Sequence, residues 1–400
     1  MRKMRDFLLI GVDGGATKVN CWSVKVDENG KFSLGDTNVV HSYSEYSEFD
    51  PEFVPVELNI QLAERANGSI NLLESEKRQA VAYTKACADA IIEVVRREHR
   101  HRILVGIGMP GLKTADQRGI SVMANGPRQT NYAENIEKEL TNAGLELVAP
   151  IGHIGSDAFY CGLGEEYALA GQFRDVRNSY YLGGGTGAAD ALKLQGKLIS
   201  LDDISGWFLK TWEMKCPEGR SLETYVASRG IQSLFGELSG KTLAGLNSRE
   251  IYPPQIKAMA LQGNQAARTT FEKVAKYLAL LLYERITTLY AGWQGFFDFV
   301  NPNRPAPEPE HRYLGTLLDR IIIGQRLGDI FRESEKDPIL WQPFIQSLNI
   351  LICESSVLDD DAKSHYCDDG HFDFNRIGYS NLREAPALGA GIDAYLNYKE

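Results

Sequence analysis

The sequence predicts an α/β protein with two lobes, and three observations lead to that class. The chain has 400 residues, which is more than one simple hydrophobic core accommodates. Apolar runs typical of buried strands alternate with segments of helical periodicity. The arrangement strand, glycine turn, strand occurs twice, at residues 7–26 and again at residues 179–199. A two-part α/β chain accounts for all three.

In the first half, two strands are predicted in "FLLIGVDGGATKVNCWSVKVD" and a buried strand in "RILVGIGMPG". Residues 42–55 are acidic and aromatic without periodicity, so we predict a loop that could also serve as a lid or dimer element. Helices are predicted from the spacing in "SEKRQAVAYTKACADAIIEVVRREH", in "NYAENIEKELTNAG" with Gly144 as its stop, and in "AFYCGLGEEYALA". "LELVAPIGHIGSD" is predicted to be a strand.

The second half begins with the repeated strand and glycine turn and is then mostly helical. "AARTTFEKVAKYLALLLYERITTLYAGW" predicts a long buried helix, and residues 301–312 predict a proline-rich loop. "DRIIIGQRLGD" predicts a buried strand running into a turn, and residues 354–373 predict an acidic surface insertion. "REAPALGAGIDAYLNY" predicts a closing helix, which we expect to pack on the first lobe.

Composition excludes several function classes. The formal charge of −10 argues against nucleic acid as a partner, because a phosphate backbone requires a basic footprint. There is no run of 18 apolar residues to span a membrane, and the start lacks the apolar stretch and cleavage site of a secretory signal. The six cysteines are scattered without a CxxC pair, which predicts reduced thiols and a cytoplasmic location.

Two glycine turns are candidate phosphate sites. In "GVDGGATK", Gly14 and Gly15 allow a tight turn that presents N–H groups to an anion, and Thr17 and Lys18 add a hydroxyl and a positive charge. Asp13 could hold Mg²⁺ through water, although Asp-Gly is also the commonest hairpin signal. In "LGGGTGAAD", Gly184, Gly185, Thr186 and Gly187 form a turn without large side chains that suits a polyphosphate.

Asp157 in "GSDAFYCGLGEE" lies between a predicted strand and a predicted helix. A helix N-cap accounts for an aspartate at this position. A carboxylate at the carboxyl end of a strand in an α/β lobe is also where a general base is placed. The stretch by itself leaves both roles open, and one carboxylate can fill both.

Taken together, these segments resemble the actin-like ATPase superfamily, which has a ribonuclease H-like fold. Within it, the order "DGGATK … MPG … ANGP … SDA…GLGE … LGGGTG … LETYVASR … NP … ALGA" is similar to the ROK family of repressors, open reading frames and sugar kinases. The resemblance implies two lobes with a nucleotide cleft between them: residues 1–174 with 384–400, and residues 175–383. It also implies an enzyme that uses ATP and Mg²⁺ to phosphorylate a sugar or sugar-like polyol, and a homodimer.

The resemblance assigns roles by position. Asp13, Gly14, Gly15, Thr17 and Lys18 match the first phosphate motif, and Gly184, Gly185, Thr186 and Gly187 match the second. Gly324 and the stretch around Gly389 match the adenosine side, and Asp157 matches the catalytic base, which in this context we favour over a cap. Asn125, Ser156, Asp157, Trp207 and Glu223 match substrate positions.

The sequence also departs from the family. Ser156 stands in place of an asparagine, and Trp207 stands where the family has a histidine that binds zinc and neighbours the sugar. Of the family's cysteine cluster only Cys216 is left, in "KCPEGRSLE", and one thiolate without the histidine does not make a zinc site. We therefore expect no zinc, and a substrate other than plain glucose, such as a modified hexose or a cyclitol. A non-catalytic sugar-binding or regulatory protein is the alternative.

Three further groups have two interpretations each. "HYCDDGHFD" holds His365, Cys367, Asp369 and His371, which could form a metal clip or a polar surface loop. Trp207, Phe208 and Trp212 could be core or an aromatic wall of a sugar site. His153 is interpreted as structural, with the lining of the substrate pocket as the alternative.

Overall fold

The computed structural model describes residues 6–398, so residues 1–5 and 399–400 of the predicted first lobe lie outside the described part. The chain divides into two compact units. Unit 1 comprises residues up to Leu169 together with the segment from Glu384, and unit 2 comprises Ala170–Arg383. Among the described residues, no helix has both the length and the apolar character that crossing a membrane requires.

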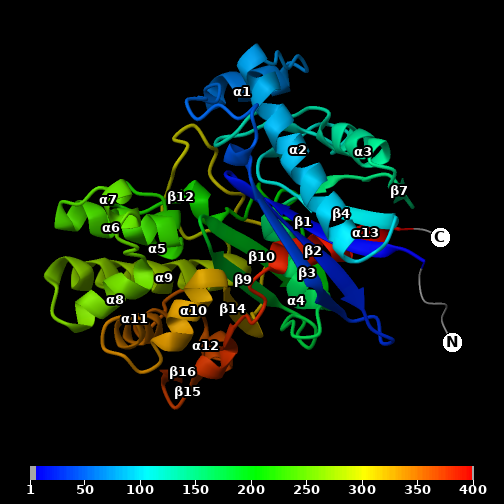
Figure 1. Ribbon diagram of the computed structural model, residues 1–400. Helices are drawn as coiled ribbons and strands as arrows, with labels where there is room; N and C mark the ends of the chain where they lie inside the picture. Colours follow the sequence, from blue (N-terminus) through cyan, green and yellow to red (C-terminus); the bar gives the residue numbers. More distant parts are fainter. Residues whose placement is uncertain (1–5, 399–400) are drawn as a thin grey trace. The chain divides into compact units, whose positions relative to one another are not determined.

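Unit 1 is built on a mixed sheet whose order is β3-β2-β1-β4-β7, with β8 also paired to β4 (Figure 1). β1 is antiparallel to β2 and parallel to β4, so the first glycine turn joins two adjacent antiparallel strands. The elements of unit 1 are β1 (Leu8–Gly14), β2 (Lys18–Val26), β3 (Phe32–Ser42), η1 (Tyr43–Glu45), α1 (Leu58–Ala66), α2 (Glu74–Arg97), β4 (Arg102–Gly108), β5 (Leu112–Lys113), β6 (Ile120–Val122), α3 (Tyr132–Asn142), β7 (Glu146–Leu147), β8 (Ile154–Gly155), α4 (Asp157–Tyr167) and α13 (Ala385–Asn397).

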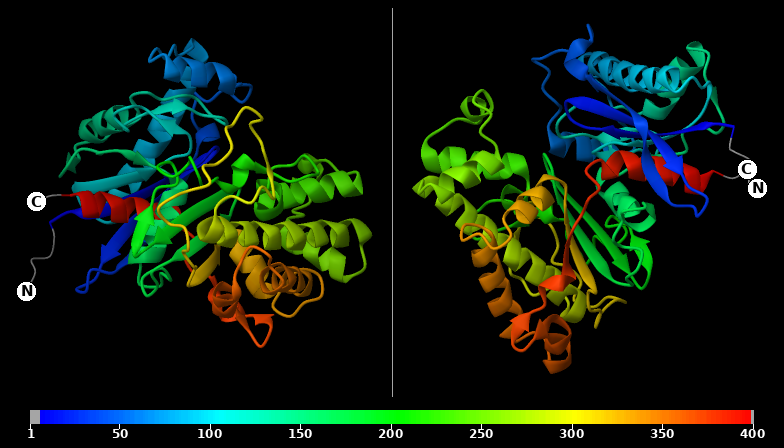
Figure 2. Two further views of the ribbon diagram at one scale, coloured as in Figure 1. Left: turned by 180° about the vertical axis from the view of Figure 1, so that it is seen from behind. Right: turned by 60° about the horizontal axis from the view of Figure 1, so that its bottom comes forward.

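Small residues let the last helix lie directly on the sheet of unit 1. A Cβ at Gly11 of β1 would lie 1.9 Å from the carbonyl oxygen of Ala387, and a Cβ at Gly106 of β4 would lie 1.9 Å from that of Ala390. Gly389 meets α4 in the same way, because a Cβ there would lie 2.0 Å from the carbonyl oxygen of Tyr160. Figure 2 shows α13 in red on one face of the blue strands and α2 on the other.

Unit 2 repeats this sheet, with the order β11-β10-β9-β14-β17 and the same sequence of strand directions. Its elements are β9 (Ser179–Gly184), β10 (Ala188–Leu194), β11 (Lys197–Ile199), η2 (Thr211–Glu213), β12 (Met214–Lys215), α5 (Glu223–Val226), α6 (Ser228–Ser239), α7 (Leu243–Asn247), α8 (Pro253–Leu261), α9 (Gln265–Ala291), β13 (Asp298–Phe299), β14 (Arg320–Gly324), α10 (Gln325–Glu333), α11 (Trp341–Cys353), α12 (Asp360–Tyr366), β15 (Cys367–Asp368), β16 (His371–Phe372), η3 (Phe374–Arg376) and β17 (Ile377–Tyr379).

A buried ionic network ties the long helix α9 to this second sheet. Arg285 of α9 lies 3.3 Å from the carboxylate of Asp190 in β10, and both side chains are almost fully buried. Asp190 also accepts hydrogen bonds from the backbone N–H of Thr211 at 2.9 Å and from the hydroxyl of Tyr180 at 2.5 Å. A buried charge is tolerated only when it is paired and hydrogen-bonded, and Asp190 meets that condition.

Three predictions about local structure are wrong. The stretch predicted as one strand at residues 145–157 contains only the two-residue strands β7 and β8. The segment after Gly324 is helix α10 and not a turn, and Gln325, the first residue of that helix, has a positive φ of 55°. Cys353 and Cys367 form a disulfide rather than two thiols, because α12 folds back and brings their Cα atoms within 6.4 Å.

Candidate active site

The first glycine turn lies at the end of β1 in unit 1. Gly14 is buried beside Met109, where a Cβ would lie 2.3 Å from the sulfur, and the N–H of Gly15 donates to the carbonyl of Lys18 at 2.9 Å. Thr17 and Lys18 are exposed. The turn thus presents a hydroxyl and a cation to solvent on a compact backbone, which is what an anion site requires.

Two stacked tyrosines donate hydrogen bonds to backbone carbonyls of this turn. Tyr43 and Tyr83 lie ring on ring with centroids 3.6 Å apart. The Tyr43 hydroxyl donates to the carbonyl of Gly15 at 3.1 Å, and the Tyr83 hydroxyl donates to that of Ala16 at 2.8 Å. Sequence reasoning missed both residues, because they lie in a loop and in α2, far along the chain from the turn.

Three carboxylates gather next to the turn. Asp13 ends β1, Asp157 begins α4 directly after β8, and Glu384 precedes α13. Burial, followed by the negative charges of Asp157 and Glu384, raises the pKa of Asp13 to about 7, while Lys18 acts in the opposite direction. The Glu384 carboxylate accepts a hydrogen bond from the Asn20 side chain at 2.6 Å. The structure therefore places Asp157 and Glu384 within electrostatic reach of Asp13.

This donor set fits Mg²⁺. Burial is the main cause of the raised pKa of Asp13, and the negative charges of Asp157 and Glu384, which a cation would offset, add to it. Within residues 6–398 no three carboxylate, cysteine or histidine side chains are close enough to form a closed metal cage. Mg²⁺ is commonly held by one or two carboxylates together with water and substrate phosphates, so Asp13 is the residue that would hold it here.

The remaining candidates of unit 1 take up different positions. Ser156 is the N-cap of α4, has extended backbone and makes no side-chain capping bond, so the helix begins at Asp157. Asn125 is exposed in the bend that follows β6. Gly389 is buried in the contact between α13 and α4, which gives it a packing role. His153 pairs with Asp393 at 2.6 Å, and this carboxylate raises the pKa of His153, in keeping with its structural interpretation.

The second glycine turn joins β9 to β10 in unit 2. The N–H of Gly185 donates to the carbonyl of Gly187 at 2.9 Å, and the carbonyl of Gly185 accepts from the N–H of Ser228 at 2.9 Å. Thr186 and Gly187 are exposed. The turn therefore has the same character as the first one, with its backbone fixed and its tip open to solvent.

Glu223, predicted to contact substrate, supports this second turn. Its Oε1 accepts a hydrogen bond from the backbone N–H of Ala188 at 2.9 Å. A Cβ at Gly187 would lie only 2.8 Å from the same oxygen, so Gly187 makes room for the carboxylate. Gly324 lies buried at the end of β14, where a Cβ would be 2.3 Å from the hydroxyl oxygen of Tyr181. Both residues therefore shape the region around β9.

Trp207 belongs to the packed part of unit 2. It is 8 % exposed and stacks on His311 with ring centroids 3.8 Å apart. Phe208 is fully buried, whereas Trp212 is 47 % exposed. Desolvation lowers the pKa of His311, which favours the neutral ring in this stack. These contacts place Trp207 and Phe208 in the core and leave Trp212 as the exposed aromatic of the three.

The cysteine and histidine candidates are engaged within the protein. Cys216 is fully buried, with its sulfur 3.4 Å from the hydroxyl of Tyr225. His365 has its Nε2 3.0 Å from the carbonyl of Leu318, and Cys367 is in the disulfide. The segment that could have been a metal clip is instead the end of α12 and the hairpin β15–β16.

No protein-family model matches the sequence, and no curated protein matches it. Solved structures do match. A ROK family glucokinase from Streptomyces griseus, in complex with glucose and AMPPNP, has a TM-score of 0.57 at 15% identity over 98% of this chain and 100% of that chain. The ROK hexokinase from Thermus thermophilus has a TM-score of 0.55 at 17% identity over 98% of each chain.

The same fold also occurs in a regulator. A ROK family transcriptional regulator, described as a homolog of the E. coli MLC protein, has a TM-score of 0.52 at 15% identity over 97% of this chain and 78% of that chain. At these identities the likeness establishes the fold. The predicted fold class is confirmed: the chain has the two-lobed α/β fold of the ROK sugar kinases.

Proposed function

We propose that this chain is a ROK-type kinase that transfers the γ-phosphoryl group of ATP to a hydroxyl of a sugar or sugar-like polyol. The observation that carries the proposal is the placement of Asp157. It is half-buried at the start of α4, within electrostatic reach of Asp13 at the end of the first glycine turn. A general base and a phosphate site must lie next to each other in such a reaction.

Each residue has a defined part in the proposed reaction. Asp157 accepts the proton of the substrate hydroxyl as that oxygen bonds to the γ-phosphorus and the bond from the γ-phosphorus to the bridging oxygen breaks. The backbone of each glycine turn, with Thr17, Lys18 and Thr186, binds phosphate oxygens. Asp13 is the residue that would hold Mg²⁺, which would supply neutralisation of phosphate charge when bound. Gly324 and Gly389 shape the adenosine side.

The substrate is proposed to be a modified hexose or a cyclitol. Asn125 and Ser156 of unit 1 and Glu223 of unit 2 are the polar residues proposed for its hydroxyl groups, whereas Trp207, which the resemblance also assigns to the substrate, is packed in the core of unit 2. The histidine of the family's zinc motif is replaced by Trp207, which stacks on His311 instead. This replacement supports a substrate other than plain glucose. A homodimer is part of the same proposal.

The test is a panel of hexoses, amino sugars and cyclitols with ATP and Mg²⁺, read out as ADP release and as the mass of the phosphorylated product. Asp157→Asn is expected to lower turnover by at least about 100-fold, the lower range for a lost general base. Asp360→Asn is the matched control, because Asp360 is likewise the first residue of a helix, α12. Equal turnover by wild type and Asp157→Asn would refute the assignment.

A non-catalytic sugar-binding or regulatory protein is the second candidate. The observation that favours it is the shared fold of a ROK transcriptional regulator. The two candidates differ in one measurement. A compound of the panel that raises the melting temperature without any ADP release supports the regulator, and ADP release that depends on that compound supports the kinase.

A cytoplasmic location belongs to the kinase proposal. Disulfides are rare in cytoplasmic proteins, so the Cys353–Cys367 disulfide provides the test of this location. The four other cysteines of the described chain are free and buried. Thiol labelling of protein denatured directly from cells that modifies all six cysteines would support this location, and protection of Cys353 and Cys367 would contradict it.

A further inference from the structure

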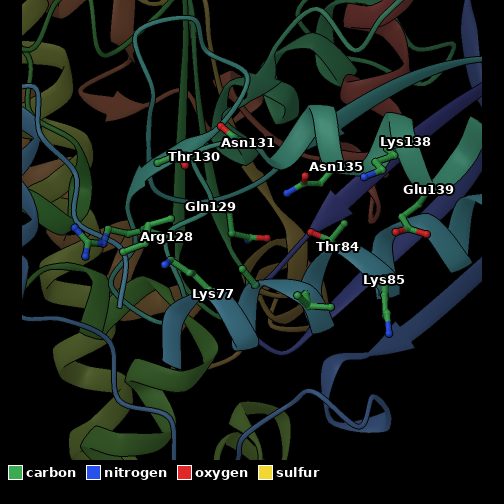
Figure 3. A pocket seen from close by; sticks show the side chains of 13 residues that line it. Lys77, Thr84, Lys85, Arg128, Gln129, Thr130, Asn131, Asn135, Lys138 and Glu139 are labelled. Carbon is green, nitrogen blue, oxygen red and sulfur yellow. The ribbon is translucent and has the colours of Figure 1, made fainter. Parts of the chain in front are cut away.

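A pocket of about 290 Å³ lies in unit 1 at residues that the proposed reaction does not use. It is formed by α2, α3 and the segment that joins β6 to α3. Figure 3 shows its lining, which contains the uncharged polar side chains of Thr84, Gln129, Thr130, Asn131 and Asn135. A cavity of this size is at the small end of ligand sites, so it suits a small molecule.

Gln129 is the unusual member of the lining. It is 4 % exposed, and neither its Oε1 nor its Nε2 has a hydrogen-bond partner among the described residues. Its backbone is fixed by two hydrogen bonds with Ile120, at 2.8 and 2.9 Å. Figure 3 shows the side chain extending toward the side on which Thr84 and Asn135 lie. A buried amide without hydrogen-bond partners has a desolvation cost in free energy. A ligand that supplies a donor and an acceptor would offset this cost.

Three of the cationic side chains around the pocket are paired with carboxylates. Arg128 is fully buried and pairs with Glu64 and Glu76. Lys85 pairs with Glu48, and Lys77 pairs with Glu74. Lys138 and Glu139 are adjacent in the lining. The lining therefore offers amides and hydroxyls beside charges of which most are paired, which suits an uncharged molecule that both donates and accepts hydrogen bonds.

The pocket is connected to the first glycine turn through α2. Thr84 lines the pocket, and the preceding residue, Tyr83, donates its hydroxyl proton to the carbonyl of Ala16 in the turn. Tyr83 also contacts the loop that carries Asn125, because a Cβ at Gly126 would lie 3.1 Å from its hydroxyl oxygen. A molecule that bridges Gln129 and Thr84 would therefore restrain both segments next to the turn.

We propose that this pocket is a second ligand site, which takes a small uncharged polyhydroxylated molecule such as a monosaccharide or a cyclitol. Paired hydroxyls donate to the Oε1 and accept from the Nε2 of Gln129, and Thr84 and Asn135 contact the remaining hydroxyls. The proposal of this second site does not depend on whether the chain is a kinase, since the pocket contains none of the residues assigned to the reaction.

The test is hydrogen–deuterium exchange of the whole chain with glucose, N-acetylglucosamine and myo-inositol as uncharged probes and glucose 6-phosphate as the charged comparator. We expect at least one uncharged probe to slow exchange in peptides covering residues 72–85 and 128–139. Gln129→Leu keeps the volume and removes the amide, so it should weaken that protection at least about tenfold in probe concentration while melting no lower than wild type.

Asn135→Ala on the exposed rim should weaken the protection as well. Asn142→Ala is its matched control on the same helix, outside the pocket. No protection by any uncharged probe, protection by glucose 6-phosphate alone, or unchanged binding by Gln129→Leu would each overturn the proposal. Loss of turnover in Asp157→Asn reports on the kinase assignment separately, so the two proposals fail independently.

Discussion

At the scale of single residues, the unusual group is the Asp13 carboxyl. A strand-end aspartate is ordinary in sequence, but in the structure it is half-buried and desolvated, near two further carboxylates, Asp157 and Glu384. Burial and like charge both disfavour its ionised form, which raises its pKa to about 7. The chain thus maintains a locally unfavourable charge arrangement. Such arrangements are typical of sites that bind a cation or carry out phosphate chemistry.

Asp13→Asn tests this arrangement through pH. The pKa of Asp13 is higher in the folded protein than its ordinary value of 3.8, so ionisation reduces the free energy of unfolding progressively as pH rises from about 4 to about 7. Relative to wild type, the variant should therefore gain roughly 2–3 kcal/mol more at pH 8 than at pH 5. Urea unfolding at both pH values measures the difference.

Asp116→Asn is the control for that experiment. Hydrogen bonds from Thr114 and the backbone of Arg118 hold the pKa of Asp116 below its usual value. It is ionised throughout the range from pH 5 to pH 8, so its substitution should shift stability equally at both. If Asp13→Asn behaves in the same pH-independent way, Asp13 is not the buried, raised group described above.

At the scale of elements, each glycine turn is a backbone fixed by side chains from distant segments. Tyr43 and Tyr83 hold the carbonyls of the first turn, and Glu223 holds an N–H at the second. The glycine patterns predicted turns because glycine accepts close contacts. The supporting residues carry no local signal, since a tyrosine in a helix or a loop is ordinary by itself. Their role exists only after the chain folds.

Tyr83→Phe should loosen the first turn. It removes the 2.8 Å hydrogen bond to the carbonyl of Ala16 and keeps the ring stacked on Tyr43. We expect a loss of about 1 kcal/mol in the free energy of unfolding and a several-fold weaker affinity for a non-hydrolysable ATP analogue. Tyr46→Phe is the control, because its hydroxyl bonds Asp89 at 3.0 Å away from the turn. Unchanged nucleotide affinity in Tyr83→Phe would contradict the supporting role.

The close packing of α13 on the sheet of unit 1 depends on Gly106. The Cβ of an alanine there would lie 1.9 Å from a backbone oxygen, that of Ala390, which cannot move without the helix. Gly106→Ala should therefore cost about 3 kcal/mol in the free energy of unfolding. A Cβ at Gly152 meets nothing within 4 Å, so Gly152→Ala should be neutral or slightly stabilising. Denaturant titration of both variants decides whether the contact is as tight as described.

At the scale of the whole molecule, the chain forms two units with separate hydrophobic cores. One core contains residues between Ile10 and Ile154, and the other contains residues between Tyr180 and Ile377. The two sheets share one strand order, which agrees with the repeated strand, glycine turn and strand in the sequence. Unit 2 is continuous in sequence, whereas unit 1 is completed by α13 from the end of the chain.

This difference predicts how fragments behave. Residues 170–383 should fold alone and unfold cooperatively, because their core is complete without the rest of the chain. Residues 1–169 should not reach a unique fold, since the strand faces at Gly11 and Gly106 would lack α13. Circular dichroism and the dispersion of amide NMR signals test both fragments. A cooperatively folded fragment 1–169 would show that α13 is not required by unit 1.

The sequence by itself determined the α/β class, the two glycine turns and the strand-end position of Asp157, because strand and helix periodicity and glycine clusters are local signals. Tertiary structure alone decided which residues surround those turns. It brought Glu384 to Asp13, placed Tyr43 and Tyr83 behind the first turn and turned Glu223 toward the second. It also joined Cys353 to Cys367 and left Gln129 unpaired in a pocket. Burial, charge proximity and hydrogen-bond partners are set by segments far apart in the chain, so they become defined only when those segments pack.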